Sequence, residues 1–224
     1  MRYPSFVTTV SLLAAASAVP AWAQSNNQSS SSAADTKRPA TLGQSQQLPL
    51  TADLRQTSNQ ALQATLYDLI ALKHDAHQEH WNIVGIEFYQ LHEFYAELYT
   101  SLDAPIDRTA ERIRALGQPS DGRPAAVAQN ALPKTPPVAE RSAKQTLTLL
   151  ENDWATVSNA LNQRIGKTSD DLVTQDLLIG ITHMIDKQLW QLRAHLARMD
   201  NNSTKNPAAK SNKSSKSNDN NSGQ

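Results

Sequence analysis

Apolar residues recur every three or four positions through most of the stretch from residue 51 to residue 200, and this period restricts the fold to packed α-helices. Leu62, Leu66 and Leu69 share one face of a first helix, and three later segments repeat the spacing. No segment shows the apolar–polar alternation of a half-buried strand. Two helix pairs separated by a long connection predict an all-α four-helix bundle with a crossover.

Local signals place the ends of the first two helices. Thr51 is a plausible N-cap, and Gly85 ends the first helix. The second helix is expected from about Glu87 to Leu116. Pro105 lies inside it and should kink the helix or remove a backbone hydrogen bond, because proline has no N–H to donate.

The second half of the chain follows the same pattern. A third helix is expected over about 138–166, and a fourth begins after a cap at Ser169 or Asp170. The connection over 118–137 is rich in proline and has room for one short helix near 125–131. The expected fold is a four-helix bundle with a short helix between its second and third long helices.

Residues 1–23 predict a secretory signal peptide. Arg2 precedes an apolar run over 6–19, and Ala21-Trp22-Ala23 matches the small-x-small pattern of a cleavage site. The run is shorter than the roughly 20 residues that span a bilayer, which favours a cleaved signal over a membrane anchor. We therefore expect export across the inner membrane, into the periplasm.

Composition divides the remainder into three parts. Residues 24–49 are polar and rich in Ser and Gln, which predicts a disordered leader, and residues 201–224 predict a disordered Asn/Ser/Lys tail. The folded domain is expected over 50–200, where acids outnumber bases. The chain has no cysteine, so disulfides, thiolate zinc sites and iron–sulfur clusters are excluded.

Histidines and acids gather between positions 74 and 111. Four of the six histidines lie within residues 74–92, and Asp107 and Glu111 are four residues apart, so both carboxylates project from one helix face. Imidazole and carboxylate together suit iron. The Glu-x-x-His motif of di-iron sites inside helical bundles does not occur in the chain, so iron would need another geometry.

His80-Trp81-Asn82, His92 twelve residues later, and then Asp107-x-x-x-Glu111 resemble the Dps mini-ferritins. Further similarity covers nearly all of 51–199, including Leu116-Gly117, Asp176-Leu177-Leu178 and Arg193-Ala194-His195-Leu196. The resemblance implies a hollow homo-dodecamer with ferroxidase sites at its two-fold interfaces. Such proteins oxidise Fe(II), preferentially with hydrogen peroxide, and store the ferric mineral, which protects against oxidative damage.

The resemblance also implies a ligand set for one or two iron ions. His80 and His92 would come from one subunit, and Asp107 and Glu111 from its neighbour. Trp81 would lie beside the site as a radical sink, with core packing as the alternative.

This chain departs from the family pattern at Ala96, where an Asp is expected four residues after His92. The iron position formed by His80, Asp107 and Glu111 is complete, whereas the second loses its carboxylate. Glu97 lies about 100° further round the helix and cannot replace it without distortion. His77 is a candidate replacement, although a half-exposed histidine beside the interface is the favoured interpretation.

Asp171 and Asp176 occupy a region that lines an iron-entry pore in similar proteins, and the alternative is that they cap the fourth helix. Two other functions stay open. The four lysines of the tail could bind DNA or another polyanion, although export argues against chromosomal DNA. Alternatively, the cage could sequester metal without fast oxidation because of Ala96.

Overall fold

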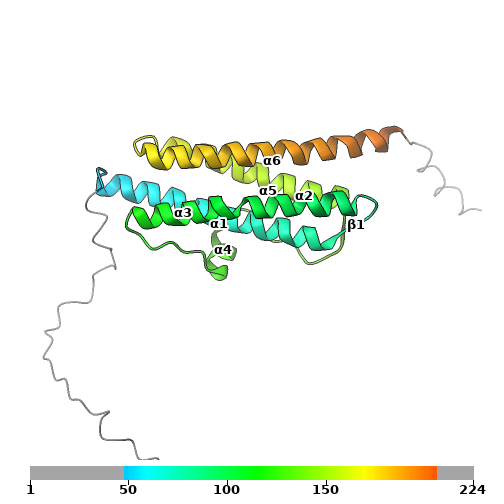
Figure 1. The fold of residues 1–224 in the computed structure, drawn as a ribbon, viewed down its shortest axis with the longest axis horizontal. Helices are drawn as coiled ribbons and strands as arrows, with labels where there is room; N and C mark the ends of the chain where they lie inside the picture. The colour runs from blue at the N-terminus through cyan, green and yellow to red at the C-terminus, as the bar shows by residue number, and fades with distance from the viewer. Residues whose placement is uncertain (1–47, 206–224) are drawn as a thin grey trace, which may run out of the picture. The chain divides into compact units, whose positions relative to one another are not determined.

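The computed structural model of the protein describes residues 48–205, and these form a four-helix bundle (Figure 1). The expected all-α bundle is confirmed. The expected signal peptide, most of the leader and most of the tail lie outside the described residues. The helices are α1 (Ala52–Asn82), α2 (Phe88–Ser101), α3 (Asp103–Ala115), α4 (Pro124–Asn130), α5 (Ala143–Lys167) and α6 (Leu172–Lys205). None of them is long and apolar enough to cross a membrane.

The core is built from the leucines that carry the helical period. Leu62, Leu66 and Leu69 of α1 are buried, together with Trp154 of α5. Burying one such side chain stabilises the fold by about 1.5–3 kcal/mol. The Trp154 indole N–H donates to Gln188 at 2.7 Å, so its polar atom is also satisfied inside the bundle.

The expected second helix is two helices, α2 and α3, which run nearly end to end in Figure 1 and are separated at Leu102. The carbonyl of Ser101, four residues before Pro105, lacks its usual helical donor because proline has no N–H. The Ser101 hydroxyl donates to the Leu98 carbonyl at 2.7 Å and accepts from the Gln188 amide at 2.7 Å. The sequence therefore predicted the disruption correctly, and the structure places it three residues before the proline.

Two caps agree with the sequence. The Thr51 hydroxyl accepts from the backbone N–H of Leu54 at 3.3 Å, as expected of an N-cap. At the end of α3, Gly117 has a φ of 89°, and the N–H of Gln118 donates to the Ile113 carbonyl at 3.2 Å. This is a Schellman-type ending, which requires the left-handed backbone that glycine adopts without strain.

Two helix starts lie later than expected. α5 begins at Ala143 rather than near Val138, because Ser142 and Gln145 form a capping box there. α6 begins at Leu172, where the N-cap side chain is Asp171 and not Ser169 or Asp170. The short helix of the connection, α4, lies within one residue of its expected position.

The structure also contains one short pair of strands that the sequence pattern did not indicate. Ile83–Val84 (β1) and Arg141–Ser142 (β2) pair in parallel, with Ile83 opposite Arg141. Two residues are too few for an alternating pattern to be visible in a sequence. This pair joins the end of α1 to the start of α5 and thereby holds the corner that carries His80.

Candidate metal centre

The two histidines of the expected site lie against each other at the α1–α2 corner. The rings of His80 and His92 are stacked, with centroids 3.6 Å apart and planes 19° from parallel. Nδ1 of His80 lies 2.6 Å from the carbonyl oxygen of His92, and Nδ1 of His92 lies 2.9 Å from the carbonyl oxygen of His80. Each imidazole is therefore held by the backbone of the other helix.

These hydrogen bonds determine which ring nitrogen is available. A carbonyl oxygen only accepts, so Nδ1 of each histidine must carry the proton and donate it. In the neutral rings, Nε2 of both His80 and His92 then bears the lone pair. Hydrogen bonding of the second ring nitrogen to a backbone carbonyl is the usual arrangement of a metal-binding histidine.

The acids of the expected site do not reach the histidines within one chain. Asp107 and Glu111 are exposed on α3, and 15 residues separate His92 from Asp107. At 1.5 Å per residue along two nearly collinear helices, the backbones of His92 and Asp107 are about 22 Å apart. Accordingly, within residues 48–205 no three His, Cys, Asp or Glu side chains are grouped so that they could hold a metal ion. One chain thus keeps the two halves of the expected site apart, with a half-exposed histidine half and an exposed acid half.

Ala96 occupies the position where a further carboxylate would complete the histidine half-site. It lies one turn after His92 on α2 and offers only a methyl group. Its carbonyl accepts from the Thr100 hydroxyl at 2.6 Å. Glu97 is exposed on a different face of α2. The weakened second iron position stays a prediction.

An aromatic cluster lies beside the histidine pair. Trp81 is 61% exposed, so it does not belong to the core of the single chain. The His77 ring lies between Trp81 and Tyr99, with centroids 4.1 Å from each, and is stacked on Tyr99. Burial lowers the pKa of His77, and the neighbouring His80 lowers it further. His77 as a ligand stays a prediction. Tyr99 was not expected, although it lies two turns after His92 on the same face of α2.

Asp171 and Asp176 occupy different environments. Asp171 is buried, and its carboxylate accepts from the backbone of Thr174 at 3.2 Å and from Arg112 at 2.9 Å. Although burial tends to raise the pKa of Asp171, hydrogen bonds from the Thr174 hydroxyl, from Ser58 and from the Thr174 N–H, together with the charge of Arg112, lower it. Asp171 is therefore the helix cap that was the alternative to a pore residue.

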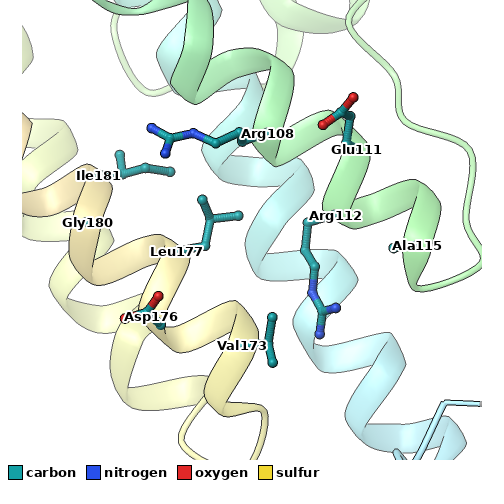
Figure 2. Close-up of a pocket in the computed structure, with 9 residues that line it drawn as sticks. All are labelled: Arg108, Glu111, Arg112, Ala115, Val173, Asp176, Leu177, Gly180 and Ile181. Carbon is teal, nitrogen blue, oxygen red and sulfur yellow. The ribbon is translucent and has the colours of Figure 1, made fainter.

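Asp176 is exposed and, with Glu111, lines a groove of about 530 Å³ between α3 and α6. Figure 2 shows the Glu111 carboxylate pointing away from α6, toward the outside of the bundle. A role for Asp176 in iron entry stays a prediction.

A second acidic group, which the sequence did not indicate, lies inside the bundle. Asp75 and Glu79 of α1 are buried, and Asp153 of α5 is partly buried near them. Glu79 pairs with Arg141 at 2.6 Å, whereas Oδ2 of Asp153 has no hydrogen-bond partner within residues 48–205. Burial, reinforced by the neighbouring carboxylates, raises the pKa of Asp75 to about 6 and that of Asp153 to about 7.

Known proteins share both the sequence and the fold. A family model described as the ferritin-like domain matches residues 59–202. DNA protection during starvation protein 2 of Deinococcus radiodurans is 35% identical over 178 residues, which cover 78% of this chain and 73% of that protein. DNA protection during starvation protein 2 of Bacillus anthracis is 34% identical and covers 54% of this chain and 83% of its own length.

Solved structures give the same result. A Dps crystal structure from Deinococcus radiodurans matches with a TM-score of 0.62 and 34% identity, over 64% of this chain and 87% of that chain. The tetragonal form of Mycobacterium smegmatis Dps matches with a TM-score of 0.65 and 28% identity, over 71% of this chain and 94% of that chain. The chain therefore belongs to the ferritin-like family and, within it, to the Dps-type mini-ferritins.

Proposed function

We propose that this protein is an exported iron-storage cage that oxidises Fe(II) with hydrogen peroxide. The observation that carries the proposal is the pair of separated half-sites. His80 and His92 are fixed with their Nε2 lone pairs free, and the carboxylates of Asp107 and Glu111 lie exposed on α3. A two-fold contact between two copies would bring each histidine pair to the other copy's acids and would form two equivalent sites.

Each residue has a distinct role in this scheme. The imidazoles bind Fe(II) through nitrogen, and the carboxylates of the second copy neutralise its charge and stabilise Fe(III), which prefers oxygen ligands. Two Fe(II) ions each give one electron to one hydrogen peroxide molecule. As its O–O bond breaks, the peroxide takes up two protons and becomes two water molecules, so no hydroxyl radical is released. Ala96 supplies no carboxylate for the second ion, so we expect oxidation to be slower than in a site with both positions complete.

Stopped-flow absorbance of ferric product tests this function. Anaerobic Fe(II) is mixed with the protein and then with peroxide, and the rate is compared with that of a protein-free control. Glu111→Gln removes one charged ligand at an exposed position and should slow oxidation with no change in the circular dichroism spectrum. Glu93→Gln, an exposed acid on α2, is the matched control. A wild-type rate equal to the protein-free rate would leave a cage that only sequesters metal.

Assembly and location belong to the same proposal. The family resemblance implies a homo-dodecamer that encloses the mineral, and light scattering of the purified protein measures its mass. The signal sequence at residues 1–23 supports export to the periplasm. Cell fractionation and N-terminal sequencing check this, and a mature protein that retains residues 1–23 in the cytoplasm would contradict it.

A second function, polyanion binding, is favoured by the names of the relatives, several of which are DNA protection during starvation proteins. The tail from residue 201 onward holds four lysines and one acid, and neutralising phosphates with lysines makes binding sensitive to salt. A gel shift at low salt with and without residues 206–224 decides between DNA binding and a solubilising tail. Equal shifts for both proteins, or none for either, would exclude a role for the tail.

A further inference from the structure

The turn between α1 and α2 exposes large apolar side chains. Ile86 is 96% exposed and Tyr89 is 72% exposed. Figure 1 shows the turn that follows β1 at one end of the bundle. Gly85, with a φ of 120°, lies in this turn directly before Ile86, which its own bundle leaves uncovered. Exposed apolar side chains that cluster in this way mark a surface that another molecule covers.

The opposite end of the bundle has a groove that could receive such a side chain. A cavity of about 870 Å³ lies between the first half of α1 and the end of α3, with Tyr67, Ile113 and Leu116 among its lining residues. Asn59, which also lines it, is only 7% exposed, and neither atom of its amide has a hydrogen-bond partner within the described residues. A buried polar group of this kind is costly unless a partner satisfies it.

One turn further along α1, Gln63 shows what an amide on this surface can bind. Its Nε2 donates to the Asp121 carbonyl at 2.7 Å, and its Oε1 accepts from the Asp121 N–H at 2.9 Å. The Gln63 amide thus binds both backbone groups of one residue in a segment without helix. Asn59 offers the same donor and acceptor four residues earlier, but no group within residues 48–205 forms a hydrogen bond with its amide.

The expected metal site sets the register of a second copy. In the proposed two-fold contact, the rod formed by α2 and α3 lies antiparallel to the same rod of the second copy. Moving toward the N-terminus of α2 in one copy therefore corresponds to moving toward the C-terminus of α3 in the other. If His92 lies opposite the region from Asp107 to Glu111, a position six residues before His92 lies opposite the region from Ile113 to Gly117. That position is Ile86, and Ile113, Leu116 and Gly117 line the groove.

We infer that the Gly85–Glu87 turn of one copy docks in the α1–α3 groove of a second copy, with Ile86 as its apolar anchor and Asn59 binding the turn's backbone. The inference rests on the proposed intersubunit iron site, which supplies the register. Charge agrees with this partner, because the groove contains one ionised residue, Arg55, and the turn contains one acid, Glu87. Each dimer would hold two such contacts, one beside each iron site.

Cysteine cross-linking tests the contact directly, because the chain has no cysteine of its own. The variant Ile86→Cys/Gln118→Cys places one thiol on the turn and one at the exposed edge of the groove. Within a chain the two positions lie at opposite ends of the α2–α3 rod, about 40 Å apart at 1.5 Å per residue. A disulfide needs Cα atoms within about 7 Å, so it can form only between copies.

Mild oxidation should give a cross-linked dimer on a non-reducing gel. The control, Val138→Cys/Gln118→Cys, moves the first thiol to another apolar position that is 84% exposed and should stay monomeric on the gel. A ladder of larger species would indicate head-to-tail contacts and would overturn the inference. Absence of a cross-link in a protein that assembles normally would also overturn it, whereas the iron-oxidation rate of wild type judges the proposed function separately.

Ile86→Glu gives an independent measurement. Because Ile86 makes almost no contact within its own chain, the variant should keep the wild-type circular dichroism spectrum. Losing one buried isoleucine on each side should weaken the dimer by about tenfold or more, as measured by analytical ultracentrifugation. Val138→Glu should leave the association constant unchanged. Equal association constants for wild type and Ile86→Glu would refute the anchor role.

Discussion

Replacing Asp153 by Asn should stabilise the protein at alkaline pH and have a smaller effect at acidic pH. Burial, together with the negative charges of Asp75 and Glu79, raises the pKa of Asp153 from 3.8 to about 7. Asparagine is nearly the same size and carries no charge at any pH. The substitution therefore removes the cost of an ionised carboxylate while keeping the packing between α1 and α5.

The sign follows from proton linkage. A carboxyl whose pKa is higher in the folded state than in the unfolded state binds more protons when folded, so the stability of the wild type falls as pH rises through that interval. From pH 5 to the folded pKa is about two units, or about 2.7 kcal/mol at 1.36 kcal/mol per unit. Asp153 is partly solvated and coupled to Asp75, so we expect a gain of about 1–2 kcal/mol at pH 8 relative to pH 5.

Urea unfolding followed by circular dichroism at pH 5 and pH 8 measures this difference, with protein concentration held constant because assembly contributes to apparent stability. Glu140→Gln, which removes the same charge at an exposed position, is the control and should shift both curves equally or not at all. If Asp153→Asn changes the free energy of unfolding by the same amount at both pH values, the buried acidic group does not titrate as described.

Three further outcomes are expected. Arg141→Ala leaves the buried Glu79 carboxylate without its partner and should lower the free energy of unfolding in urea by about 3–5 kcal/mol. Arg193→Ala removes an exposed ion pair and should lower it by about 0–1 kcal/mol. Similar losses for the two variants would contradict the burial argument. Ala96→Asp should accelerate iron oxidation in stopped flow, and an unchanged rate would mean that another residue already fills the second position. Gly117→Ala puts a side chain on a residue whose φ is 89° and should lower the free energy of unfolding by about 1 kcal/mol. An unchanged free energy of unfolding would mean that residue 117 has a different backbone conformation.

The sequence predicted those parts of the fold that depend on local patterns. Leucine spacing placed the long helices, and Pro105 indicated a break because the missing N–H acts within one turn. The start of α6 was misplaced because Ser169, Asp170 and Asp171 are all good caps, and Asp171 is selected by its ion pair with Arg112, which lies far away in the sequence. The β1–β2 pair depends on a contact between residues nearly 60 positions apart, which no local pattern contains.

The candidate site likewise has features that the sequence predicted and features that only the fold reveals. The residue types and spacing of His80 and His92 indicated metal chemistry, but their reciprocal hydrogen bonds became evident only from the fold. Asp75 and Asp153 look like ordinary solvated acids in the sequence, since a buried acid and an exposed one have the same letter. Ile86 is an apolar residue of a type that is usually buried, and only the structure shows that its own bundle does not cover it.

The short β1–β2 pair has a consequence for how this protein can be modified. It fixes one end of the long connection beside the histidine corner, and the bonds between Gln63 and Asp121 fix the other end. Lengthening a loop between fixed ends costs little, because loop-closure entropy grows only with the logarithm of length. The exposed residues 138–140 are therefore a place in this connection where a peptide or label can be inserted without shifting His80.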